Sequence, residues 1–94
     1  MTLAITIYQR RYNDNVGVGV SDVVDLNDYE PVYAYVSDKL DLRKVFVDGN
    51  VKLPLKYSLS VGDVIVAMRN GRVLYAYIVD HIGFKRIRKL ISSP

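Results

Sequence analysis

Tyrosine and arginine are the residue types in this 94-residue chain whose spacing most clearly suggests chemistry. The chain has eight tyrosines, two phenylalanines and no tryptophan. On a strand, Tyr8, Arg10 and Tyr12 would share one face, because side chains two residues apart point the same way. Aromatic rings interleaved with guanidinium groups can stack on unpaired bases. The alternative is that these tyrosines are half-buried sheet residues, with packed rings and hydroxyls that reach water.

Two further groups of basic residues are candidates for phosphate binding. Arg69 and Arg72 flank Asn70-Gly71, so a turn there places two guanidinium groups at a hairpin tip, where they could grip a phosphate. Simple exposure to solvent is the alternative for this pair. The second group could follow a nucleic-acid backbone or form an ordinary solvated face. It consists of Lys85, Arg86, Arg88 and Lys89.

The charge of the chain is small in total but unevenly distributed. The net charge is +3, yet residues 14–41 hold seven acidic side chains and one lysine, whereas residues 42–94 hold ten basic and three acidic ones. The basic half is compatible with a polyanionic partner such as nucleic acid. The alternative is a domain in which acidic and basic segments face each other.

Few residues are available for catalysis or for metal binding. The chain has no cysteine and one histidine, which excludes disulfides, thiolate metal sites and thiol catalysis. His81 follows Asp80, but neighbours on a strand point to opposite faces. We find no glycine-rich phosphate loop and no paired-histidine spacing. We therefore expect a protein that is not an enzyme and has no metal site and no cofactor.

Length and hydropathy indicate one domain without a membrane span. The longest apolar run, Val73–Val79, is far shorter than the roughly 17–25 residues of a membrane helix. The N-terminal residues lack the pattern of a secretory leader. We expect a single domain over residues 1–94, cytoplasmic and without membrane contact.

Most of the chain has the pattern of β-strands. Residues 2–7 alternate, with Leu3, Ile5 and Ile7 on one face. Residues 63–79 predict a hairpin with a two-residue turn at Asn70-Gly71, and this register places Val66 opposite Tyr75. Both faces of this hairpin are apolar. It is therefore either central to the fold or covered by a second subunit.

Two other segments carry shorter signals. Residues 45–57 predict a hairpin around Asp48-Gly49-Asn50, because Asp-Gly favours a tight turn. Residues 84–91 fit a short amphipathic helix, with a strand as the alternative.

Residues 20–46 and 61–88 resemble each other. Tyr33-Ala34-Tyr35 aligns with Tyr75-Ala76-Tyr77, so both halves carry a pair of tyrosines at strand spacing. A pseudo-two-fold structural repeat and a chance similarity of valine-rich strands both explain the match.

Residues 59–91 resemble the closing strands of PUA and ASCH barrels, which are small RNA-associated domains. The matching segments are Val61-Gly62-Asp63-Val64-Ile65, Asn70-Gly71-Arg72-Val73, Ala76-Tyr77-Ile78-Val79, and Ile82 and Phe84 before Ile87-Arg88-Lys89-Leu90. The resemblance implies a small RNA-associated barrel and assigns no site residue. Gly49–Pro54 with Gly62–Ile65 also resembles swapped-hairpin transcription regulators of the AbrB type.

These observations predict a mainly β domain, either a small barrel or two packed hairpins, with a short C-terminal helix. We expect a non-enzymatic module that binds nucleic acid, either RNA or single strands. The alternative is a homo-oligomer such as a dimer, with a structural or interaction role, assembled through the hairpin that is apolar on both faces. The residues expected to contact nucleic acid are Tyr8, Arg10, Tyr12, Arg69, Arg72, Lys85, Arg86, Arg88 and Lys89.

Overall fold

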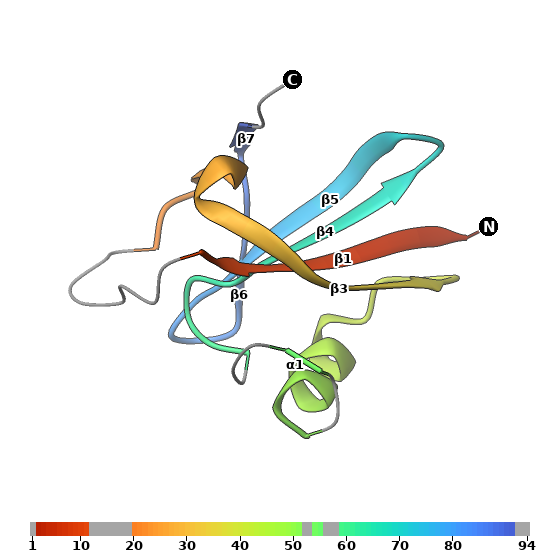
Figure 1. Cartoon of the computed structure of the whole chain (residues 1–94), viewed down its shortest axis with the longest axis horizontal. Helices are drawn as coiled ribbons and strands as arrows, with labels where there is room; N and C mark the ends of the chain where they lie inside the picture. The colour runs from red at the N-terminus through yellow and green to blue at the C-terminus, as the bar shows by residue number, and fades with distance from the viewer. Residues whose placement is uncertain (1, 12–19, 52–53, 56–58, 92–94) are drawn as a thin grey trace.

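A five-stranded antiparallel sheet forms the centre of the molecule (Figure 1). The computed structural model describes residues 2–11, 20–51, 54–55 and 59–91. The strand order is β3-β1-β4-β5-β6, and β2 and β7 form a separate parallel pair. The elements are β1 Leu3–Arg10, β2 Val23–Asp25, the 3-10 turn η1 Leu26–Asp28, β3 Tyr29–Ser37, α1 Leu42–Val51, β4 Val64–Arg69, β5 Arg72–Val79, β6 Phe84–Arg86 and β7 Lys89–Ile91.

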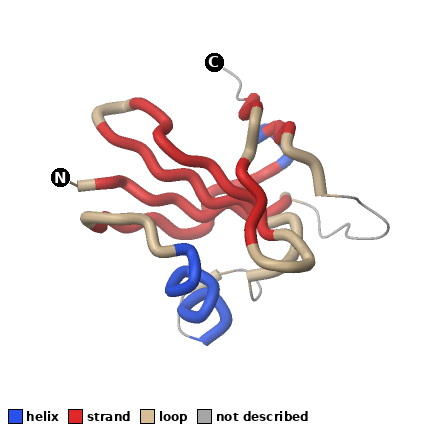
Figure 2. Tube along the Cα trace, turned by 180° about the vertical axis from the view of Figure 1, so that it is seen from behind, coloured by secondary structure: helices blue, strands red, loops and turns tan. Residues whose placement is uncertain are grey.

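The prediction of a mainly β fold with one short helix is confirmed, and the sheet is open rather than a closed barrel. Its two edges are β3 and β6. Figure 2 shows α1 on one side of the sheet and the β2–β7 pair on the other. The central strands are thus covered on both faces.

Two hydrophobic cores lie on opposite faces of the sheet. The core beneath α1 includes Leu3, Ile5, Ile7, Val45, Ile65 and Ala67. The core beneath β2 and β7 includes Val24, Val64, Val66, Ala76, Ile78 and Ile87. Consecutive β4 residues alternate between the two cores, so the two apolar faces of the predicted hairpin are explained by its central position within one chain.

The turn of this hairpin is as predicted, but the register beyond it is not. Asn70 and Gly71 have φ values of 54° and 77°, as a type I′ turn requires. A bulge then leaves Leu74 without a partner on β4. Tyr75 consequently pairs with Ala67 rather than with Val66. This one-residue shift moves Tyr75 to the face of the sheet that carries α1.

The predicted hairpin over residues 45–57 is wrong, because residues 42–51 form α1. The Asp41 carboxylate accepts a hydrogen bond from the Lys44 backbone N–H at 3.2 Å, which satisfies an otherwise unpaired donor in the first turn of the helix. Gly49 serves close packing and not a turn. A Cβ atom there would lie 3.0 Å from the Leu59 Cβ. Most of the predicted second strand lies outside the described residues.

The predicted C-terminal helix is also wrong, and the strand alternative is correct. Residues 84–86 pair with β5, and residues 89–91 pair with β2. The backbone N–H groups of Arg88 and Lys89 both donate to the Asp22 carbonyl, which anchors the start of β7. The proposed repeat does not extend through this region, since residues 42–44 are helical and their counterparts 84–86 form a strand.

A buried polar network joins β1 to the start of β4. Gln9 and Asp63 are 0% and 1% exposed. The Gln9 amide donates to the Asp63 carboxylate at 3.0 Å, and the Ser60 backbone N–H donates to the same oxygen at 2.9 Å. Beside it, the Tyr29 hydroxyl donates to the Gly62 carbonyl at 2.6 Å. These hydrogen bonds therefore link β1 and the first residue of β3 to the segment that leads into β4.

Gln9→Leu should lower the free energy of unfolding by about 2–3 kcal/mol, because it removes a donor from a buried carboxylate. Urea denaturation measures the change. Val36→Thr on the exposed edge is the control, with an expected effect below about 0.5 kcal/mol. Equal effects of the two substitutions would show that the buried pair is not important for stability.

Candidate nucleic-acid interface

A groove lies where α1 leaves the sheet uncovered, between β5 and the segment that connects β3 to α1. Its volume is about 410 Å³. Its lining combines four leucines with two tyrosines and charged side chains. We call it the tyrosine–arginine groove. It is lined by Leu3, Asp38, Lys39, Leu40, Leu42, Arg69, Leu74, Tyr75 and Tyr77.

The bulge in β5 directs both tyrosines into this groove. Tyr75 and Tyr77 pair with Ala67 and Ile65, which belong to the core on the α1 face. Directly opposite residues of an antiparallel pair share a face. The two rings therefore lie on one face, with their Cα atoms about 6.5 Å apart along the strand. Tyr75 is 41% exposed, so its ring is accessible to a ligand.

Three arginines share this face of the sheet. Arg69 and Arg72 oppose each other at the hairpin tip, as predicted, and Arg69 lines the groove. Arg86 on β6 pairs with Tyr77 and is exposed. The rings thus lie between guanidinium groups at the hairpin tip and one on β6. The chemistry fits stacking on flat rings combined with binding of phosphates.

The predicted platform on β1 has a different role. Tyr8 packs against the core on the β2–β7 face. The Arg10 guanidinium lies 5.9 Å from the centre of the Tyr29 ring, and its Nε is 3.4 Å from the Tyr29 hydroxyl. These contacts match the alternative of packed sheet residues. Tyr12 lies outside the described residues.

The predicted cluster over residues 85–89 is divided by the pleat of the strands. Lys85 pairs with Ile78 and so lies on the opposite face from Arg86. Arg88 forms an ion pair with Asp22 at 3.2 Å. Lys89 is exposed on β7. Of these four residues, Arg86 alone shares the face of the groove.

The sequence showed the Tyr75–Tyr77 spacing but not that both residues line a groove. Leu74, which forms the bulge, places these rings in the groove, and Lys39 also lines it. Neither has a local signature, because a bulge depends on how two strands pair. The strand spacing of the tyrosines was the signal that could have found the site.

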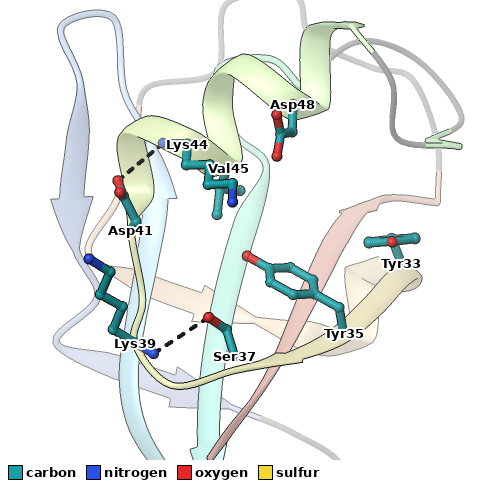
Figure 3. Close-up of a pocket in the computed structure, with 8 residues that line it drawn as sticks. All are labelled: Tyr33, Tyr35, Ser37, Lys39, Asp41, Lys44, Val45 and Asp48. Atoms are coloured by element: carbon teal, nitrogen blue, oxygen red, sulfur yellow. Dashed lines mark hydrogen bonds between the residues drawn. The ribbon is translucent and has the colours of Figure 1, made fainter.

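A second hollow, of about 290 Å³, lies between β3 and α1 (Figure 3). We call it the helix–edge pocket. The Tyr33 and Tyr35 ring centroids are 5.8 Å apart, with their planes tilted by 36°. The pocket is lined by Tyr33, Tyr35, Ser37, Lys39, Asp41, Lys44, Val45 and Asp48.

Burial and the nearby Asp48 carboxylate raise the pKa of the Tyr35 phenol above its ordinary value, with smaller contributions from Tyr33 and Asp41. Both main causes disfavour the phenolate. At neutral pH the hydroxyl is therefore a neutral group that can donate and accept hydrogen bonds.

Acid–base catalysis, metal binding and a membrane span find less support among the described residues. Asp80 accepts a hydrogen bond from the backbone N–H of His81 at 2.7 Å, in an exposed turn. No three His, Asp or Glu side chains among the described residues are grouped to hold a metal ion. In the same part of the chain, no helix has the length and apolar character needed to cross a membrane.

Comparison with known proteins identifies one family. The sequence profile described as the YodL-like domain matches residues 5–90. No curated protein and no solved structure matches the chain. The comparisons give no support to the resemblance to PUA and ASCH barrels, and the open sheet also differs from a barrel.

The raised pKa of Tyr35 predicts a contribution to stability that is lost at alkaline pH. The folded state retains the phenolic proton better than the unfolded state, whose tyrosines titrate near pH 10. The contribution is therefore complete below about pH 10 and declines as the pH rises further. Tyr35→Phe should show a smaller alkaline loss of unfolding free energy than the unsubstituted protein. An unchanged loss, measured by urea denaturation between about pH 8 and 11, would contradict this assignment.

Proposed function

The chain belongs to the family of YodL-like domains, and we propose that this member is a non-enzymatic module that binds single-stranded nucleic acid, RNA above all, in the tyrosine–arginine groove. The observation that carries the proposal is the placement of Tyr75 and Tyr77 on one sheet face, in a groove that α1 leaves open, beside Arg69, Arg72 and Arg86. The proposal includes no catalytic step.

Stacking on an open sheet is a common way of binding unpaired bases. Every base has a flat face, so rings on a strand bind single strands with little dependence on sequence. The leucines that line the groove add apolar surface beside the rings. Arg69 and Arg72 at one end, with Arg86 near the other, are placed to contact the phosphates that connect stacked bases.

The concave shape of the groove favours single strands over duplex. In a duplex the flat faces of the bases are stacked on one another and cannot reach rings in a recess, whereas unpaired bases can turn outward onto aromatic side chains. Among the described residues that line the groove, Leu42 is the only one that comes from α1. The site therefore lacks a recognition helix that could enter the major groove of a duplex.

Asp38 is the acidic residue in the lining of the groove, and its carboxylate repels phosphate. Lys39 and Arg69 line the same groove and carry the opposite charge. The balance of charge is positive, because Arg72 and Arg86 add to these cations on the same face.

Tyr75→Ala should weaken binding of a labelled single-stranded RNA about 5- to 150-fold, because stacking of one base on an aromatic ring contributes about 1–3 kcal/mol. Fluorescence anisotropy at physiological salt measures the dissociation constant. Tyr75→Phe is the matched control, since it keeps the ring and should keep most of the affinity. Equal affinity of the alanine and phenylalanine variants would remove stacking from the proposal. Stronger binding of duplex DNA than of single strands would contradict the proposal itself.

Replacing Arg69 and Arg72 together by Gln should reduce the slope of log affinity against log salt by about 1.4, since each phosphate contact on a single strand contributes about 0.7. The matched control replaces Lys85 and Lys89 by Gln. It removes the same charge away from the groove and should change the slope much less. Equal slopes in the two double variants would show that binding is general attraction to a basic protein.

A further inference from the structure

The helix–edge pocket and the tyrosine–arginine groove are neighbours, separated by the segment that connects β3 to α1. Side chains of this segment alternate between them: Ser37 and Asp41 line the pocket, whereas Asp38 and Leu40 line the groove. Lys39 lines both. In Figure 3 its ammonium group points away from the pocket tyrosines. A nucleic-acid strand in the groove can therefore reach the pocket by crossing a single short segment.

The pocket has an aromatic wall and a polar wall. Tyr33 and Tyr35 on β3 form the aromatic wall. Lys44 and Asp48 on α1 form the polar wall, and Figure 3 shows the Tyr35 hydroxyl and the Asp48 carboxylate directed into the space between strand and helix. The pocket thus offers a ring surface, a cationic donor, a neutral hydroxyl and the Asp48 carboxylate as an acceptor. The second carboxylate, Asp41, accepts from the Lys44 backbone N–H.

This combination matches one nucleobase. A base extruded from a strand is held by stacking on aromatic side chains and by hydrogen bonds to its Watson–Crick edge. The volume of about 290 Å³ lies at the lower end of the range for small-molecule pockets, which suits a single base. A carboxylate has about four acceptor sites, so Asp48 can accept from a base in addition to its contacts within the protein.

The polar wall distinguishes bases by their edges. Cytosine presents an amino donor, which a carboxylate accepts, next to acceptor atoms that Lys44 or the Tyr35 hydroxyl can serve. Uracil presents a carbonyl oxygen in place of the amino group and keeps one donor, its ring N–H. A carboxylate placed at the exocyclic position therefore accepts from cytosine and repels the uracil oxygen. A purine requires more space than a pyrimidine.

We infer that the helix–edge pocket holds one base of the bound strand and favours cytosine over uracil, with Asp48 as the residue that determines the preference. This inference rests on the proposed function, because the strand must first bind in the neighbouring groove.

The test compares labelled oligocytidylate and oligouridylate of equal length by fluorescence anisotropy at physiological salt. Oligocytidylate should bind roughly 5- to 100-fold more tightly, as expected for one well-paired base edge. Asp48→Asn should remove most of this preference, because an amide both donates and accepts. Asp38→Asn is the matched control: it removes the same charge from the groove and should strengthen binding of both oligonucleotides without changing their ratio.

The outcomes separate this inference from the proposed function. Equal binding of the two oligonucleotides, with the effect of Tyr75→Ala preserved, overturns the base pocket and leaves the groove proposal intact. A preference that survives Asp48→Asn also overturns the pocket. Failure of both oligonucleotides to bind overturns the groove proposal and the pocket with it.

A second measurement covers the case in which Asp48→Asn does not fold. Cytidine monophosphate is titrated into the unsubstituted protein, and backbone amide shifts are followed by nuclear magnetic resonance. Shifts at Tyr35, Lys44 and Asp48, larger than those caused by uridine monophosphate, are the expected result. Equal shifts for the two nucleotides, or shifts confined to other residues, reject the pocket.

Discussion

The Asp63 carboxylate, buried at the start of β4, is the group on which the rest of the structure depends. The Gln9 amide and the Ser60 backbone N–H donate hydrogen bonds to it. A shift of β1 along β4 would remove the Gln9 hydrogen bond from a buried carboxylate, which is energetically costly. The backbone of Asp63 also accepts from Val79, which sets the far end of β5. One residue thereby aligns three adjacent strands. The placement of every side chain over the sheet, including those of the groove, follows from this alignment.

Local rules were sufficient for the parts of the fold that local sequence controls. The Asn70-Gly71 pair made the central hairpin predictable, because both residues readily adopt the positive φ values found there. The alternation of apolar residues made β1 predictable. The helix was missed because Asp48-Gly49 resembles a turn, whereas Gly49 is required by the close approach of Leu59. Such a reason exists only once the chain has folded, and no pattern within residues 42–51 reveals it.

The difference between local sequence patterns and contacts made only in the folded chain also explains why the candidate site was not predicted correctly. Tyr8 with Arg10 and Tyr75 with Tyr77 have equivalent spacing, so sequence periodicity ranks them equally. Burial separates them: Tyr8 packs against a core, whereas Tyr75 remains accessible. The basic residues over 85–89 are close in sequence, yet the alternation of a strand sends Lys85 and Arg86 to opposite faces. Charge counted along the chain therefore overestimates the charge that one surface can present.

The parallel pairing of β2 with β7 has a consequence for the order in which the molecule forms. It joins residues 23–25 to residues 89–91, so the contact closes a long stretch of chain and carries a large entropic cost. The pairing of β1 with β4 closes a stretch of similar length, between residues 4–8 and 64–68, but it needs no residue beyond β4. Because β7 is the last described strand along the chain, the core beneath β2 and β7 is the last to have all of its segments available during synthesis. The nascent domain would therefore pass through a stage with one face of its sheet uncovered, and its exposure to aggregation or chaperones would be concentrated there.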